Sequence, residues 1–386
     1  MADLDAYQLR QNPFEIVSHA HEMANRKEEW THVSKSLYSA FEAKSPRFIF
    51  LLGDWGEGKS YILDQIYRSL SGTIDREGRV FVARMRSRVL YPKPLVLRES
   101  EPRWQKFGLD LIIRVLNNIA RDKWSEVLRK ANLGGLDSVY LKVFQGLRDN
   151  EESAFKYIAG RKLGTDELKK LEVSEPLTSS PQVIELFFDF LRAIRLAGYS
   201  NFLLLLDEFE YITAILGEVR ITQVLNTFRE IFDHCGYYGP GEIASPIFFF
   251  AISPGGWERL KELESSARKK TGGGGIAPFM ERVILRDIIH LKPFAFEDTK
   301  QLVKLRLEEA RTKKVTDPFH PFTEMCIEYV HGLSFNKPRN VIQYCSILLE
   351  DALDEGLEKI DEKDAKRILE KYGIYPTGSE SAGNST

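Results

Sequence analysis

Residues 48–60 contain the sequence feature that most restricts the fold of this chain. An apolar run, Phe48–Leu52, has the length and composition of a buried β-strand, and Gly53-Asp54-Trp55-Gly56-Glu57-Gly58-Lys59-Ser60 follows it directly. This segment matches GxxxxGK[ST] in full, and the helical spacing of apolar residues continues from Tyr61 to Leu70. A strand, a glycine-rich turn and a helix in this order predict a phosphate-binding loop (P-loop).

The loop predicts a nucleotide site with named contacts. Glycines let backbone N–H groups turn toward a phosphate, and the following helix adds the positive end of its dipole. We expect Lys59 to reach the β- and γ-phosphates and the Ser60 hydroxyl to bind Mg²⁺. The residues predicted to bind nucleotide through this loop are Gly53, Asp54, Trp55, Gly56, Glu57, Gly58, Lys59, Ser60 and Tyr61.

A second apolar strand ends in two carboxylates. Asn201–Leu206 is followed by Asp207 and Glu208. A strand that is apolar throughout belongs in the middle of a sheet covered on both faces, and ligands of open α/β sheets bind at carboxyl ends of strands. We therefore expect Asp207 to hold Mg²⁺ and Glu208 to polarise the water that attacks the nucleotide, as a general base.

A third apolar strand, Ile247–Ile252, ends in Ser253. A polar residue at this strand tip is a candidate to hydrogen-bond the γ-phosphate or the attacking water, so Ser253 joins the predicted catalytic residues. The alternative is that Ser253 caps the helix or turn that follows. The sequence leaves both roles open.

Composition limits the class of protein. The chain has 386 residues, which corresponds to roughly two to three domains. Its net charge is −2, so bulk charge does not drive it onto nucleic acid or membrane, although a local basic patch stays open. The three cysteines form no CxxC or disulfide pattern, and no run has the length of a membrane span or the pattern of a signal peptide. We expect a cytoplasmic protein with no membrane partner.

The succession of P-loop, acidic strand end and polar strand tip resembles the AAA+ ATPases. The resemblance implies an α/β fold: a P-loop NTPase parallel-sheet sandwich with a C-terminal helical lid and a helical insertion. It also implies ATP as the nucleotide, in agreement with the lack of an NKxD-like guanine motif, and ATP held between core and lid. Four segments with helical spacing match the lid: Phe296–Ala310, Pro321–Val330, Pro338–Ala352 and Glu362–Tyr372.

Two further segments carry the resemblance. His331 to Ile342 is similar to the lid turn before the sensor-2 arginine, which implies that Arg339 contacts nucleotide; the alternative is a surface arginine at a helix start. The N-terminus is similar to the origin-recognition and initiator clade, in which a short arm and an R-x-x-E-like helix start surround the adenine. The matching residues are Pro13, Phe14, Arg26 and Glu29.

The resemblance also implies an arginine finger that reaches the γ-phosphate of a neighbouring subunit. Arg282 is the best positional match and Arg286 the second, and an ordinary surface arginine is the alternative for both. A cation supplied in trans stabilises the phosphoryl-transfer state and makes hydrolysis depend on assembly. This predicts a homo-oligomer or a hetero-assembly formed through the nucleotide interface.

The predicted domains are an N-terminal arm and adenine-side helix (1–45), an ATPase core (46–292), a lid (293–373) and a disordered tail (374–386). Val80–Ala83 is the predicted second strand and Gln182–Leu196 the helix before the acidic strand. Between them, residues 93–180 form a helical insertion that departs from the family pattern, and we expect it to bind a protein partner. Initiators carry a winged-helix domain after the lid, and this chain leaves no room for one.

Basic clusters give a second set of candidates. Arg84, Arg86 and Arg88 alternate after the predicted second strand, and Arg268–Lys270 precede a glycine run. Either group is a candidate to bind DNA phosphates or to form a solvated surface. The predicted function is an ATPase that drives a nucleic-acid-associated switch or motor in replication, repair, transposition or mobile-element defence. The alternatives are a KAP- or signalling-type P-loop switch acting on protein partners, and a scaffold that only binds nucleotide.

Overall fold

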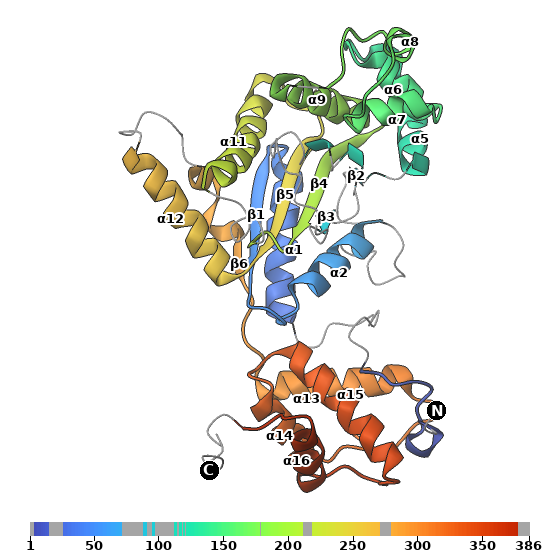
Figure 1. The fold of residues 1–386 in the computed structure, drawn as a ribbon, viewed down its shortest axis with the longest axis vertical. Helices are drawn as coiled ribbons and strands as arrows, with labels where there is room; N and C mark the ends of the chain where they lie inside the picture. Colours follow the sequence, from blue (N-terminus) through green and yellow to red (C-terminus); the bar gives the residue numbers. More distant parts are fainter. Residues whose placement is uncertain are drawn as a thin grey trace, which may run out of the picture. The chain divides into compact units, whose positions relative to one another are not determined.

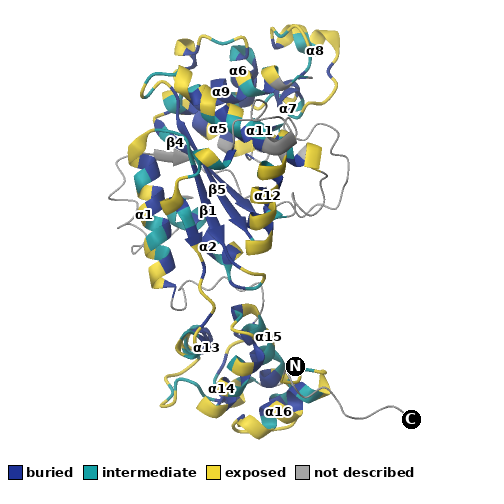
Figure 2. Ribbon diagram, turned by 90° about the vertical axis from the view of Figure 1, so that its left-hand side faces the viewer, coloured by how far each residue is buried: buried dark blue, intermediate teal, exposed yellow. Residues whose placement is uncertain are grey.

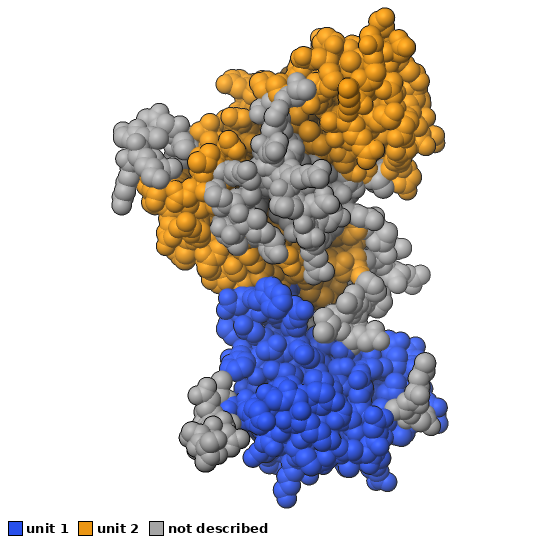
Figure 3. Space-filling view, viewed as in Figure 1, with its two compact units in different colours: residues 1–30, 54–58, 291–386 blue, residues 31–53, 59–290 orange. Residues whose placement is uncertain are grey.

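The structure is a computed structural model. It describes residues 4–14, 26–71, 88–90, 95–96, 112–113, 116–117, 119, 121–177, 179–210, 218–270 and 279–376. The chain divides into two compact units (Figure 3): a helical unit of residues 1–30, 54–58 and 291–386, and a sheet unit of residues 31–53 and 59–290. The predicted second strand at residues 80–83, most of the Arg84–Arg88 cluster and the glycine run lie outside the described residues.

The sheet unit is built on parallel strands (Figure 1). Its elements are β1 (Arg47–Leu52), β2 (Arg88–Leu90), β3 (Leu95–Val96), β4 (Tyr199–Asp207), β5 (Ser245–Ile252) and β6 (Ile288–His290). The order is β2-β4-β5-β1-β6, with β3 also paired to β4, and every pairing is parallel. The register pairs Leu52 with Ile252 and Leu206 with Phe250. The carboxyl ends of β1, β4 and β5 therefore meet at one edge, which confirms the predicted α/β class.

The middle strands are buried because their sequences are apolar throughout. Every residue of β5 is buried, and in β4 only Ser200 is not (Figure 2). Aromatic rings fill the space beside them: Phe50 stacks on Phe250 with ring centroids 4.7 Å apart, and Phe48 lies 4.7 Å from Phe279. Contacts of this kind add about 0.5–1.5 kcal/mol beyond their buried area. Packed aromatic rings thus support the core beneath the carboxyl edge.

The described helices of the sheet unit include α1 (Lys27–Ala43, from Thr31 on), α2 (Lys59–Ser71), α9 (Ser180–Leu196), α11 (Glu218–His234) and α12 (Pro254–Lys270). Helix α9 agrees with the helix predicted before the acidic strand. Two of its rings pack against Phe202 of β4: the ring centroid of Phe187 lies 5.8 Å from that of Phe202, and the ring centroid of Phe190 lies 5.3 Å from it. Its first turn has a Pro, as helix starts favour.

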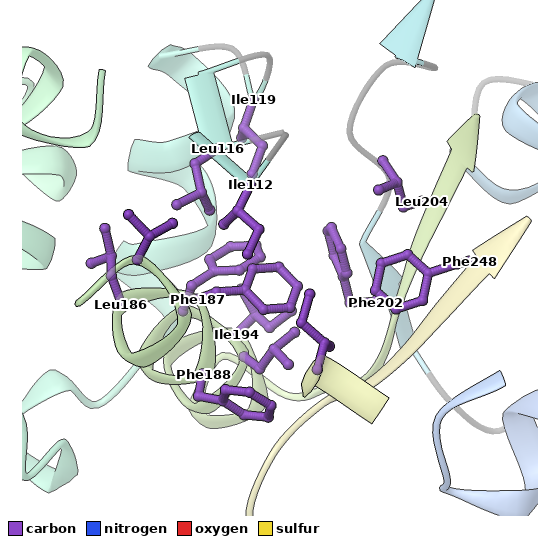
Figure 4. Close-up of a cluster of buried hydrophobic side chains, with 14 of the residues drawn as sticks. Ile112, Leu116, Ile119, Leu186, Phe187, Phe188, Ile194, Phe202, Leu204 and Phe248 are labelled. Carbon is purple, nitrogen blue, oxygen red and sulfur yellow. The ribbon is translucent and has the colours of Figure 1, made fainter. Parts of the chain in front are cut away.

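The helical insertion is part of the same core. Its described helices are α5 (Arg121–Lys130), α6 (Leu141–Arg148), α7 (Glu152–Ile158) and α8 (Thr165–Lys170). Trp124 of α5 is 1% exposed, and its ring lies 5.2 Å from that of Phe190 in α9. Figure 4 shows Ile112, Leu116 and Ile119 in the same cluster as Phe187 and Phe202. The insertion therefore packs on the sheet unit through α9.

The helical unit contains α13 (Phe296–Ala310), α14 (Glu324–Leu333), α15 (Pro338–Asp354) and α16 (Glu362–Lys371), close to the four predicted segments. Its core includes Cys326, Cys345 and Leu348, each fully buried. The N-terminal arm packs on this unit: Arg10 N–H donates to the Ala310 carbonyl at 2.8 Å. The arm thus belongs to the same compact unit as these four helices, whereas the predicted domain limits group it with the following helix.

The cysteines behave as buried apolar residues. Cys235, Cys326 and Cys345 are free and buried. Burial raises the pKa of the Cys235 thiol to about 12 and raises the pKa of the Cys326 thiol as well. A thiol with a raised pKa is a poor nucleophile at neutral pH. Among the helices in the described part of the chain, none is both long and apolar enough to cross a membrane.

Candidate nucleotide-binding site

The P-loop joins the carboxyl end of β1 to the first turn of α2. Gly53 N–H continues the strand pairing by donating to the Ile252 carbonyl at 3.2 Å. Gly56 and Gly58 have φ angles of +85° and +98°, a backbone region that other residues adopt with strain. Within the turn, Asp54 N–H donates to Glu57 Oε2 at 2.7 Å. The glycines thus sit where the turn requires them, and α2 begins at Lys59.

Lys59 is held at the base of the loop. Its side chain is 7% exposed, and Nζ donates to the Gly53 carbonyl at 2.7 Å. Ser60 follows on the exposed side of the first turn, and Tyr61 is half-buried. Lys59 and Gly53 belong to the sheet unit, and Asp54–Gly58 to the helical unit.

Asp207 is the last residue of β4 and is 7% exposed. Its Oδ1 accepts the Glu208 N–H at 2.9 Å. Asp207 and the Ser60 hydroxyl are oxygen donors of the type that Mg²⁺ prefers. The residues present therefore fit a magnesium ion that is completed by phosphate and water oxygens.

Glu208 has a strained backbone. Its φ is +51°, in the left-handed region that a glutamate rarely adopts. The next residue fixes this turn: Phe209 N–H donates to the Ala251 carbonyl at 2.9 Å, and the fully buried Phe209 ring lies 4.5 Å from that of Phe250. Strain of this kind is stored at functional sites and costs about 1–3 kcal/mol.

Ser253 lies directly after β5 and caps α12. Its Oγ accepts the Gly256 N–H at 3.2 Å, and its carbonyl accepts the Trp257 N–H at 2.9 Å. This is the capping alternative that the sequence left open. A role toward the γ-phosphate stays a prediction, because a hydroxyl has further hydrogen-bonding capacity.

Arg26 and Glu29 form a buried ion pair in the helical unit, with N–O atoms 2.8 Å apart and side chains 7% and 8% exposed. Arg26 also donates to the P-loop carbonyl of Glu57 at 2.9 Å and lies 4.6 Å from the Phe294 ring centroid. Arg26 of the R-x-x-E pair thus binds the loop backbone, and Glu29 holds Arg26 in place. Its predicted place beside the adenine stays a prediction.

Arg339 is the second arginine at the loop. It lies in the first turn of α15, and its N–H donates to the Gly56 carbonyl at 3.3 Å. A Cβ on Gly56 would meet the Arg339 Cβ at 3.2 Å, so the absence of a side chain allows this approach. The Arg339 guanidinium stacks 4.5 Å from the ring of Trp55, which is 65% exposed. Arg339 thus contacts Trp55 and Gly56, which belong with it to the helical unit, and its predicted role toward nucleotide stays a prediction.

Other predicted residues lie elsewhere. Pro13 and Phe14 are buried in the core of the helical unit, where Phe14 meets Phe322 edge to face at 5.7 Å. Arg282 ends the 3₁₀-helix η4 (Phe279–Arg282) and forms two 2.7 Å hydrogen bonds to Asp233 of α11. Arg286 donates to Ser39 Oγ at 2.9 Å. The predicted role of either arginine toward a neighbouring subunit stays a prediction.

Sequence reasoning missed Glu210. Its carboxylate accepts the Ser253 N–H at 3.2 Å and lies 3.9 Å from Lys59 Nζ. The signal was present, since Asp207-Glu208-Phe209-Glu210 has three carboxylates around one apolar anchor. The contact to Lys59 depends on the pairing of strands that are distant in sequence, which the local pattern does not specify.

Comparisons with known proteins agree with the fold. The structure of the Aeropyrum pernix ORC2 protein in ADPNP–ADP complexes matches with a TM-score of 0.51 and 11% identity, over 97% of this chain and 73% of that one. Cdc6p from Pyrobaculum aerophilum matches with a TM-score of 0.47 and 10% identity, over 93% and 70%. The likeness to ORC2 shows a shared fold and agrees with the expected α/β class.

Sequence comparison reaches less far. No family model matches the chain. An uncharacterized HTH-type transcriptional regulator from Methanocaldococcus jannaschii is 34% identical over 87 residues, which are 22% of this chain and 21% of that protein. The chain thus matches about a fifth of the length of this relative. No group of three or more His, Cys, Asp and Glu side chains arranged for a metal occurs in the described segments.

Proposed function

We propose that this chain with an AAA+ fold binds ATP and hydrolyses it with Mg²⁺. The observation that supports this most directly is the loop after β1, where Gly56 and Gly58 turn the backbone at φ +85° and +98° and Lys59 starts α2. Amide groups at such a turn and the helix N-terminus attract phosphate. The Asp207 and Glu208 carboxylates end a strand of the same parallel sheet, at the edge where β1 also ends.

Each residue has a defined task in this proposal. Lys59 exchanges its carbonyl contact for the β- and γ-phosphates, and Ser60 with Asp207 holds the magnesium ion. The ion neutralises charge on the phosphates. Glu208 accepts a hydrogen bond from the attacking water and takes up its proton. The buried Phe209 anchor holds Glu208 in place during this step.

The two arginines on the loop would respond to nucleotide. Arg339 is in contact with Gly56 and Trp55, so a phosphate in the loop lies within reach of a guanidinium that is already adjacent. We propose that Arg339 leaves the Trp55 ring to contact the nucleotide. Arg26, fixed by Glu29 and the Glu57 carbonyl, would keep the loop backbone in its binding shape.

We propose further that hydrolysis drives an oligomeric, nucleic-acid-associated switch or motor. The likeness to an origin-recognition fold supports this role, and a switch acting on protein partners through the insertion is the alternative. The two functions separate in a DNA-binding measurement at two salt concentrations. ATP-dependent affinity that falls steeply with salt favours the first function, since phosphate contacts release counterions. No binding at physiological salt favours the second.

The direct test of the proposed function is nucleotide binding combined with mass measurement. Titration calorimetry with ATP and Mg²⁺ is expected to show binding, and light scattering is expected to show a larger mass with a slowly hydrolysed ATP analogue than without nucleotide. Absence of any affinity for ATP would refute the function itself. Binding with an unchanged mass would refute only the oligomeric part.

Arg282→Ala tests the finger in trans. The guanidinium is 17% exposed and paired with Asp233, so it must leave this partner to serve a neighbour. Hydrolysis is expected to fall by about 10³-fold or more in assembled protein, the effect of losing such a finger. Arg286→Ala is measured beside it, because Arg286 is the second candidate: a loss of hydrolysis in Arg286→Ala and not in Arg282→Ala would assign the finger to Arg286.

Subunit mixing separates a finger from a structural role. Mixing Arg282→Ala with Glu208→Gln subunits should recover activity, because some interfaces then pair an intact finger with an intact base. If no mixing ratio restores turnover, Arg282 does not act in trans. The measurement is the rate of phosphate release from ATP at each mixing ratio.

A further inference from the structure

Glu210 links two parts of the site within the sheet unit. One oxygen, Oε2, accepts the Ser253 N–H at 3.2 Å, and the other, Oε1, lies 3.9 Å from Lys59 Nζ. The side chain is 19% exposed, and that of Lys59 is 7% exposed. A partly desolvated carboxylate therefore lies beside the cation that the P-loop directs at phosphate.

The first turn of α12 is shaped around Glu210. A Cβ built on Gly256 would lie 2.6 Å from the Glu210 Cβ and 3.2 Å from its Cα. No side chain other than hydrogen fits at this distance. At the neighbouring Gly255, a Cβ would meet nothing within 4 Å. Gly256 thus permits a close contact that Gly255 does not share.

The oxygen atoms near Lys59 Nζ include the Gly53 carbonyl at 2.7 Å and the Glu210 carboxylate at 3.9 Å. A triphosphate carries more negative charge than one carboxylate, so a triphosphate bound at the loop attracts the Lys59 ammonium more strongly than Glu210 does. Nucleotide must therefore draw Lys59 away from Glu210, and the same carboxylate holds the start of α12 through Ser253.

We propose that Glu210 is a positioning residue that acts as an internal anion: it competes with nucleotide phosphate for Lys59 and ties that exchange to the Ser253 cap of α12. This inference rests on the proposed function, since it concerns the same phosphate. It assigns to Glu210 a control of nucleotide affinity. Removing the Glu210 charge should then tighten ATP binding, whereas removing a carboxylate that held the magnesium ion would weaken it.

Glu210→Gln tests the proposal, because glutamine keeps an oxygen that accepts the Ser253 N–H but removes the charge beside Lys59. Calorimetry with ATP and Mg²⁺ is expected to give about threefold tighter binding, the range of a partly exposed ion pair. Affinity for adenosine, which has no phosphate, should not change. A merely structural defect would weaken binding of both ligands.

Two controls complete the design. Asp64→Asn removes a negative charge from α2, where Asp64 pairs with Arg68 at 2.8 Å, and is expected to leave ATP affinity unchanged. Gly256→Ala is expected to push Glu210 from its place and tighten ATP binding, whereas Gly255→Ala should not. The double variant Glu210→Gln/Gly256→Ala should bind ATP no more tightly than Glu210→Gln, because both changes act on one contact.

The outcomes separate the two proposals. Wild-type protein that fails to bind ATP would remove the proposed function. Wild-type protein that binds ATP while Glu210→Gln binds it equally or more weakly would overturn the role of Glu210 alone. Tighter binding in Asp64→Asn as well would overturn it too, by showing an effect of net charge.

Discussion

Glu208→Gln is expected to bind ATP as the wild type does and to lose turnover by at least about a hundredfold, the contribution of a positioned general base. The amide has the shape of the carboxylate but does not take a proton from water. The backbone should not move, because the φ of +51° at this position is fixed by the hydrogen bond from Phe209 N–H to the Ala251 carbonyl. The loss would therefore report on charge and proton transfer.

Two controls make the Glu208 result specific. Glu126→Gln changes a half-exposed glutamate of α5 that pairs with Lys130, and should leave turnover unchanged. Lys59→Ala should lose ATP binding, which marks the difference between a binding defect and a chemical defect. Survival of turnover in Glu208→Gln, measured by phosphate release at saturating ATP, would show that another group activates the water.

The parts of the fold that the sequence predicts well are those in which one short segment carries all the information. Phe48–Leu52 and the loop after it form β1 and the P-loop because the apolar run and the glycines act locally. Helix α13 has the predicted bounds, Phe296–Ala310, because its apolar spacing is regular. Long apolar runs also fix β4 and β5 in the middle of the sheet.

Edge strands are predicted poorly because their pairing is not local. β6 covers only Ile288–His290, and it becomes a strand by pairing with β1, more than two hundred residues earlier. Three residues give no usable alternation. The same applies to β2 and β3, which are strands because they pair with β4. The sequence placed the second strand earlier, at residues that the structure does not describe.

Side-chain partners explain the remaining differences at the site. Arg282 has the right place in the chain for a finger, but its partner in this structure, Asp233, comes from α11. The sequence predicts Arg26 and Glu29 beside the adenine, whereas the ion pair between them and the contact of Arg26 with the Glu57 carbonyl follow from the packing of the loop. A motif specifies residue types at a spacing, whereas tertiary packing decides which donor meets which acceptor.

Phe14 shows most clearly how a motif and the packing can point to different roles. Its motif predicts a place near adenine, and its ring is 1% exposed in the core of the helical unit. The arm that carries it is tied down locally: Phe14 N–H donates to Asn12 Oδ1 at 2.9 Å, and Asn12 Nδ2 donates to Ser346 Oγ of α15 at 2.9 Å. This packing predicts that Phe14 stabilises the helical unit whether or not nucleotide is bound.

Phe14→Ala is therefore expected to destabilise the helical unit by about 3 kcal/mol, since it leaves a cavity beside Phe322. Hydrogen exchange in α14 and α15 should become about a hundredfold faster, because local opening becomes more favourable by that amount. Phe335→Ala is the matched control in the same unit: that ring is 55% exposed, and its loss should change stability by less than about 0.5 kcal/mol. Unchanged exchange in Phe14→Ala together with weaker ATP binding would instead assign the ring to the nucleotide, because a core residue acts on stability before it acts on affinity.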